Sequence, residues 1–238
     1  MAKKLKVLNL SGCEGLTRTP DFSTFTALEI LNLGMCKNLV ELGEITHCKK
    51  LIEIQGFGKL DVSNLEMLKE LKLHKCQKLD KVEGLGVLKS LVILDATWCT
   101  SLERLDLSNL KNLKELRIRD CKNLTEIQGL EELESLGFLD MAGCKLIEKL
   151  PNLSNLKKLK ILVAFFCEKL TEIQGLEELK SFKLLDISGC KSMERLLDLS
   201  NTRIDKNSRR AEVWESKGLV GWEPEEWRGW ESEGWEAY

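Results

Sequence analysis

The chain has 238 residues, and its 36 basic residues against 38 acidic ones give a net charge of −2. So small a net charge provides no overall field toward nucleic acid or an anionic membrane, and neither is expected as a partner. The sequence contains no run of about 18 apolar residues that could span a membrane. Its start also lacks the apolar core and cleavage site of a signal peptide, so we expect a cytoplasmic or nuclear location.

The first strand is expected at Leu5–Leu10, and a frame of leucines with one cysteine then returns at every 22nd or 23rd position along most of the chain. In each unit the pattern is L-x-x-L-x-L-x-x-C-x-x-L-x-x-[IL]. A fixed period of about 20–29 residues with this spacing is typical of leucine-rich repeats. We therefore predict an α/β solenoid, a leucine-rich-repeat horseshoe with parallel strands on the concave face and short helical or 3-10 segments on the convex face.

The repeat array is expected to occupy residues 1–205, as about 8–9 coils with a period of about 22–23 positions each. Residues 40–66 are irregular, because the interval from Cys36 to Cys76 is shorter than two regular coils need. Two cramped coils, or one coil with a looped-out segment, would both fit. Leu51-x-x-Ile54 could supply a strand there. Further along, Thr-Glu-Ile-Gln-Gly-Leu-Glu-Glu-Leu begins at Thr125 and again at Thr171, two coils later, which indicates that a unit of two coils was duplicated.

The nine cysteines are interpreted as structural thiols. One cysteine per coil makes a column of parallel side chains about 4.8 Å apart, whereas the Cβ atoms of a disulfide converge to about 3.8 Å. The chain has no C-x-x-C pair and only two histidines, which argues against a zinc site. We expect buried thiols that donate weakly to the turn backbone of each coil, and we predict no metal and no cofactor.

The leucine frame stops before residues 206–238, for which we predict a disordered acidic tail rich in tryptophan. Residues 211–238 hold eight glutamates against Lys217 and Arg228, a local charge of −6, together with five of the six tryptophans. No apolar period survives there, which favours disorder. The alternative is an aromatic recognition peptide that folds on binding.

The binding surface is predicted on the outward positions of the strands, where solenoids make their contacts. Between Leu113 and Ile118 the apolar spacing tightens from three to two, which indicates a strand with alternating faces. Aromatic and arginine side chains, which often anchor protein interfaces, occur at these positions or just before a cysteine. The candidate protein-binding residues are Lys72, His74, Asp95, Trp98, Arg117, Arg119, Asp120, Phe165 and Phe166. No catalytic constellation or phosphate-binding loop accompanies them, so we predict that the chain is not an enzyme.

The segment Leu16-Thr-Arg-Thr-Pro-Asp-Phe-Ser, followed by Leu-Glu-Ile-Leu-Asn-Leu-Gly-Met-Cys, closely resembles a repeat of plant disease-resistance receptors of the TIR–nucleotide-binding–leucine-rich-repeat class. The resemblance covers about residues 1–205 and is specific at the Pro20-Asp21-Phe22-Ser23 motif. It implies that the repeats recognise a pathogen effector or a guarded host protein and restrain a nucleotide-binding domain. The TIR and nucleotide-binding domains are absent from this chain, so the resemblance implies a recognition fragment.

Two other interpretations compete with this one. The first is a substrate receptor of the F-box leucine-rich-repeat type, although those repeats are longer and carry Ile-Thr-Asp after the cysteine. The second is a degenerate gene fragment, which the shortened coil and the tryptophan-rich tail favour. The first strand begins almost at Met1 without a capping unit, so we also expect that an N-terminal part is missing.

Overall fold

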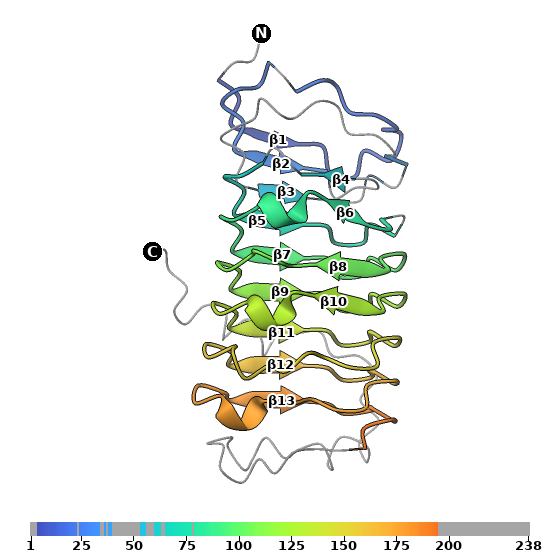
Figure 1. Cartoon of the computed structure of the whole chain (residues 1–238). Coiled ribbons are helices and arrows are strands. Elements are labelled where there is room, and N and C mark those ends of the chain that lie inside the picture. The colour runs from blue at the N-terminus through green and yellow to red at the C-terminus, as the bar shows by residue number, and fades with distance from the viewer. Residues whose placement is uncertain are drawn as a thin grey trace.

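The computed structural model describes residues 4–22, 24–33, 36, 38–39, 53–55, 60–62, 65–77 and 79–194. The predicted tail at 206–238 and most of the irregular stretch 40–66 lie outside these residues. The described coils are stacked so that their strands form one parallel sheet (Figure 1). In sheet order the nine strands are β1 Val7–Asn9, β2 Ile30–Asn32, β3 Glu53–Gln55, β5 Glu70–Lys72, β7 Ile93–Asp95, β9 Glu115–Arg117, β11 Phe138–Asp140, β12 Ile161–Val163 and β13 Leu184–Asp186.

Some coils carry a second, shorter strand, and Figure 1 shows these strands as a second column beside the main sheet. They form the parallel pairs β4 (Leu60–Asp61) with β6 (Val82–Glu83) and β8 (Arg104–Asp106) with β10 (Glu126–Gln128). The 3-10 helices η1 (Leu85–Val87), η2 (Leu130–Glu132) and η3 (Leu176–Glu178) lie apart from this column, in the segments that lead to β7, β11 and β13. The helices η2 and η3 occupy equivalent positions in the two copies of the duplicated sequence. The predicted leucine-rich-repeat solenoid is confirmed, and the short strands opposite the main sheet are an addition to it.

In the main-sheet strands whose side chains the structure describes, the middle residue enters or packs against a continuous apolar core. The register aligns Leu71, Leu94 and Leu116, and all three are fully buried. Their neighbours in the strand face outward, because successive side chains of a strand point to opposite faces. A single coil cannot cover its own leucines, so each coil buries those of the next. Each fully buried side chain contributes about 1.5–3 kcal/mol, and stacking is therefore what stabilises the array.

One coil is shorter than the others. Ile54 pairs with Leu31 at the regular spacing along the chain, but its other partner, Leu71, follows it at a much shorter spacing. In the regular coil that comes next, the path from the main strand to the second strand runs from Leu71 to Val82. In the short coil the same path runs only from Ile54 to Leu60. The stretch between the two strands of the short coil (60 − 54 = 6 positions) is therefore five positions shorter than the same stretch of the next coil (82 − 71 = 11 positions).

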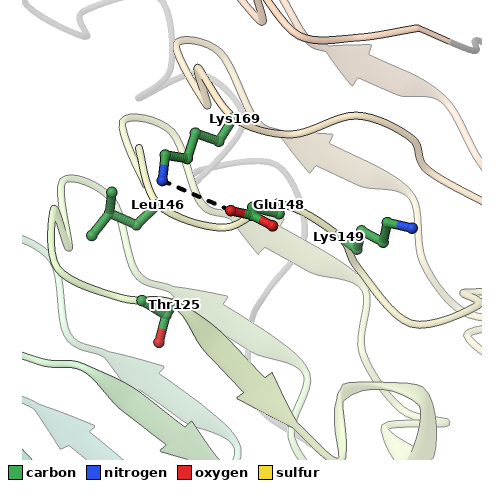
Figure 2. Close-up of a pocket in the computed structure, with 5 residues that line it drawn as sticks. All are labelled: Thr125, Leu146, Glu148, Lys149 and Lys169. Atoms are coloured by element: carbon green, nitrogen blue, oxygen red, sulfur yellow. Dashed lines mark ion pairs between the residues drawn. The ribbon is translucent and has the colours of Figure 1, made fainter.

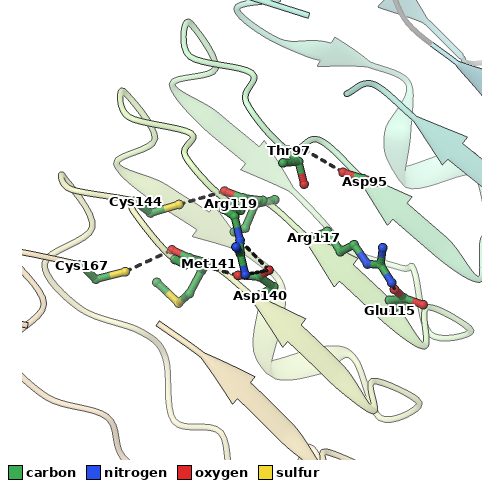
Figure 3. A network of polar contacts seen from close by, with 11 residues as sticks. Asp95, Thr97, Glu115, Arg117, Arg119, Asp140, Met141, Cys144 and Cys167 are labelled. Atoms are coloured by element: carbon green, nitrogen blue, oxygen red, sulfur yellow. Dashed lines mark hydrogen bonds and ion pairs between the residues drawn. The ribbon is translucent and has the colours of Figure 1, made fainter. Parts of the chain in front are cut away.

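The cysteines form a ladder along one corner of the stack. The Cys144 thiol donates to the carbonyl oxygen of Ile118 at 3.0 Å, and the Cys167 thiol donates to that of Met141 at 3.1 Å (Figure 3). The same bond to the preceding cysteine-bearing coil, at 3.0–3.1 Å, is made by Cys36, Cys99, Cys121 and Cys190. All eight cysteines that the structure describes are free thiols. The predicted role of the thiols as weak donors to the backbone is confirmed.

Burial suppresses the ionisation of the ladder thiols. Burial raises the pKa of Cys121 to about 12 and that of Cys144 well above its ordinary value. For Cys99 and Cys167 the main cause is a hydrogen bond with a neighbouring thiol, which raises the pKa of each, and burial raises it further. These thiols are therefore protonated and unreactive at neutral pH. The prediction of burial is wrong for Cys13, which is exposed because no described coil precedes its own to cover it.

Candidate protein-binding surface

The predicted binding residues lie in three neighbouring columns on the outward face of the main sheet. The last strand residues Lys72, Asp95 and Arg117 are aligned by the register and form the first column. The second column lies two residues further along each coil and contains His74, Arg119 and Phe165. The third column lies three residues further along and contains Trp98, Asp120 and Phe166. The structure thus brings all nine residues to one face and its adjoining edge, although only some of them touch one another.

Arg119 lies at the centre of a connected group on this face (Figure 3). Its Nε and Nη2 groups donate to Oδ2 of Asp140 at 3.0 and 2.9 Å. Asp140 is 6% exposed, and burial raises the pKa of its carboxyl group while Arg119 opposes the shift. The guanidinium carbon of Arg119 also lies 5.0 Å from the ring centre of Phe165. Arg119 and Phe165 belong to the coils on either side of the coil that contains Ala142. Ala142 is fully buried.

The prediction missed another outward column, at the first residue of each strand. Glu115 forms an ion pair with Arg117, whose guanidinium carbon lies 5.6 Å from the ring centre of Phe138 in the next strand. The register continues the column from Phe138 to Ile161 and Leu184, which are all partly exposed. We call Phe138, Ile161 and Leu184 the apolar stripe. Strand alternation contained this signal, because the residue before a buried leucine faces outward like the residue after it.

The residue before each cysteine adopts a left-handed backbone conformation in most of the coils. Glycine, which reaches this conformation easily, occupies the position at Gly143 and Gly189, with φ of 71° in both. Trp98 and Phe166 occupy it with φ of 65° and 56°, although their side chains are large and are 45% and 56% exposed. Such a conformation costs of order 1–3 kcal/mol outside glycine and is often found at functional sites. Lys75 and Asp120 also adopt it, with φ of 62° and 56°, so the conformation belongs to the corner as such. Trp98 and Phe166 differ from them because their side chains are large, aromatic and exposed.

Neighbouring coils hold both aromatic side chains in place. The Nζ atom of Lys75 lies 5.4 Å from the ring centre of Trp98. The Phe166 ring covers Gly189 so closely that a Cβ atom added at Gly189 would lie 2.3 Å from the ring. Phe166 also meets Phe165 edge to face, with their ring centres 5.6 Å apart. One side of the Phe166 ring is thus packed, and the side chain remains more than half exposed.

The end of the face nearest β5 is more polar. Lys72 forms an ion pair with Glu70 at 2.8 Å. Partial burial lowers the pKa of the His74 imidazole, and Asp95 opposes that shift. Within the described ranges, no group of three or more histidine, cysteine, aspartate or glutamate side chains could hold a metal ion. This end of the face therefore offers charged pairs and an imidazole that is mainly neutral at pH 7.

A separate hollow of about 430 Å³ lies on the side of the second strands (Figure 2). The residues that line it are Thr125, Leu146, Glu148, Lys149 and Lys169. Lys169 and Glu148 form an ion pair of 3.8 Å at its edge. None of the predicted binding residues lines this hollow. It is bordered mainly by exposed charged side chains, which favour solvation over the enclosure of a small ligand.

Comparisons with known proteins support the fold and one sequence relationship. No model of a known protein family matches the chain. Over 84 residues the chain is 34% identical to the TMV resistance protein N of Nicotiana glutinosa, a stretch that covers 33% of this chain and 7% of that protein. This similarity links a third of the chain to a plant disease-resistance protein. Within the described part of the chain, no helix has the length and apolarity of a membrane span.

Two solved internalin structures also resemble the chain. The functional domain of InlJ from Listeria monocytogenes, which includes a cysteine ladder, matches 85% of this chain with a TM-score of 0.51 and 21% identity. This chain spans 57% of that InlJ chain. An InlF internalin of the same species matches 84% of this chain and 78% of its own at 16% identity, with a TM-score of 0.27. The InlJ similarity concerns the fold, a stack of leucine-rich repeats.

Proposed function

We propose that this chain is a non-enzymatic protein-recognition module that binds its partner with the outward face of the main sheet between β7 and β12. The observation that carries the proposal is the exposure of two large aromatic side chains, Trp98 and Phe166, at corner positions with a left-handed backbone. Both side chains are large and exposed, so core packing does not explain why glycine is not used there. Contact with a partner explains it, because large aromatic side chains are frequent anchors of protein interfaces.

The contacts around Arg119 support the same surface. Arg119 is held by Asp140 and by the ring of Phe165, and the ring of Phe166 is held against Gly189. Side chains that are already ordered lose less conformational freedom when a partner binds. A face of this kind suits recognition of a folded protein surface better than chemistry on a small substrate.

In its finer form, the proposal is that the chain corresponds to the effector-sensing and autoinhibitory repeats of a plant intracellular immune receptor. The similarity to TMV resistance protein N over a third of the chain and the motif at Pro20–Ser23 support it. The partner would be a pathogen effector, a guarded host protein or the nucleotide-binding domain of a receptor, in the cytoplasm or nucleus.

Site-specific photocross-linking tests the surface. The full chain would carry p-benzoylphenylalanine at Phe166 or, as a control, at Lys111, an exposed residue of the turn before β9. We expect a discrete cross-linked protein from plant-cell extract with the probe at Phe166 and none at Lys111. Trp98→Gly, which removes an anchor and places glycine in a left-handed position, should abolish the product without loss of a cooperative melt. Equal products at both positions would contradict the proposed surface.

The finer proposal has its own test, with a purified TIR–nucleotide-binding segment of a receptor of the resembled class as the probe. We expect this segment to co-purify with the full chain and to be lost from the complex with Trp98→Gly. Failure of this binding, with the cross-link at Phe166 intact, would leave the recognition surface and refute the contact with a nucleotide-binding domain.

A further inference from the structure

Five exposed lysines border the apolar stripe of Phe138, Ile161 and Leu184. Two turns of the chain, residues 157–160 and 180–183, supply them and contain no acidic residue. We call Lys157, Lys158, Lys160, Lys180 and Lys183 the lysine edge. Glu177 and Glu178 of η3 lie close by, and Glu178 pairs with Lys157 at 3.4 Å. Five lysines against two glutamates leave a local charge of +3 next to partly exposed apolar side chains.

We propose that residues 211–238 of this same chain bind to the lysine edge and the apolar stripe. This segment carries a net charge of −6 and five tryptophans. Its glutamates complement the lysine edge, and its indole rings complement the exposed surface of Phe138, Ile161 and Leu184. Opposite charges beside apolar and aromatic contacts favour such an interface, because charge sets the register while apolar burial supplies the affinity.

The distances along the chain allow this contact. The described chain ends at Glu194, in the coil that follows β13, and β13 carries one end of the apolar stripe. Residues 195–210 separate Glu194 from the acidic segment. A segment of this length reaches at most about 53 Å when extended, whereas the stripe crosses three adjacent strands, or about 10 Å. A tether of this length gives an effective concentration of about a millimolar, so even a weak contact would form within one molecule.

The contact would cover the sheet face beside the proposed partner surface. Phe138 of the stripe already lies against Arg117, one of the predicted binding residues. A segment bound across β11, β12 and β13 would therefore compete with an external partner. The inference goes beyond the proposed function and does not depend on it, because it concerns a contact that needs no second protein.

Tryptophan fluorescence of the full chain tests the inference, since five of its six indoles lie in residues 211–238. We would compare acrylamide quenching of the unaltered chain with that of Lys158→Glu/Lys183→Glu. The matched control is Lys111→Glu/Lys122→Glu, which changes the same charge at two exposed lysines outside the lysine edge. We expect the quenching constant to rise about threefold in the first variant and to stay unchanged in the control. Salt of about 1 M, which shortens the Debye length to about 3 Å, should mimic the first variant.

Three results would overturn the inference. One is a quenching constant in the unaltered chain equal to that of the synthetic peptide 211–238 alone. Another is an equal rise in both charge-reversal variants, because the effect would then not belong to the lysine edge. The third is shielding of the indoles that disappears on dilution, which would show contact between two copies. Circular dichroism of each variant verifies that the coils remain folded, and the photocross-link at Phe166 can fail or succeed independently.

Discussion

The cysteine ladder should make the stability of this protein sensitive to alkaline pH. Folding raises the pKa of Cys99, Cys121, Cys144 and Cys167 above the ordinary value of 9.0, at which thiols of the unfolded chain ionise. A group whose pKa is raised by folding contributes its stability below the unfolded pKa and loses it as the pH rises toward the folded pKa. For Cys121 this window runs from 9.0 to about 12.

The structure sets the size of the effect. Within its window each thiol lowers the free energy of unfolding by about 1.4 kcal/mol per pH unit. At about pH 10 four such thiols together remove at most about 6 kcal/mol, against a total stability of about 5–15 kcal/mol for a typical domain. The hydrogen bond with Cys167 lowers the pKa of Cys190, and this opposite shift offsets part of the loss. Ionisation of these thiols within the folded chain would not avoid this loss of stability. A thiolate at Cys144, for example, has no proton to donate to the carbonyl oxygen of Ile118. We therefore expect the free energy of unfolding to be markedly lower at about pH 10 than at neutral pH.

Urea titrations followed by circular dichroism, between about pH 7 and about pH 10 under reducing conditions, measure this dependence. Cys121→Ser removes one titrating group and should reduce the pH slope of the unfolding free energy by about a quarter. Cys13→Ser should leave the slope unchanged, because the Cys13 thiol is exposed. An unfolding free energy that does not change with pH across the window would refute the reasoning, as would an equal slope in both variants.

Three further predictions test other parts of the structure. Iodoacetamide at neutral pH should label Cys13 first, and mass spectrometry showing equally rapid labelling of the buried thiols would contradict the ladder. Gly129→Ala should lose about 2–3 kcal/mol in urea unfolding, because φ is +73° and the new Cβ would lie 2.6 Å from a backbone nitrogen. Gly86→Ala, with its nearest contact at 3.3 Å, should lose less, and equal losses would count against this explanation. Arg119→Ala should lower the free energy of unfolding by about 3 kcal/mol in thermal or urea unfolding, because it leaves the buried Asp140 carboxylate without its partner. Adding Asp140→Asn to this variant should recover part of the loss, and no recovery would argue for another cause.

The sequence was sufficient for the architecture because the repeat is a strong physical constraint. Equivalent apolar residues that recur every 22 or 23 positions can all be buried when the coils stack in register, as Leu94 and Leu116 show. The same constraint predicted the column of free thiols. It failed at Cys13, because burial depends on a neighbouring coil and not on the residues of its own coil.

The irregular coil shows where local pattern stops being informative. The sequence between Cys36 and Cys76 allowed more than one arrangement of strands. The pairing of Ile54 with both Leu31 and Leu71 decided among them, because backbone hydrogen bonds to two neighbouring strands select one register. Such a choice depends on the coils on either side, which a short segment does not encode.

By itself, the sequence determined that outward residues would lie in columns on one face, since strand alternation and a constant period assign each residue its column. Only the tertiary structure decided which of them meet. Arg119 and Phe165 belong to coils that are two periods apart along the chain, yet they touch because two coils advance the stack by only about 10 Å. The left-handed backbone of Trp98 and Phe166 was likewise decided in three dimensions, since the turn into the cysteine corner imposes it whichever side chain is present.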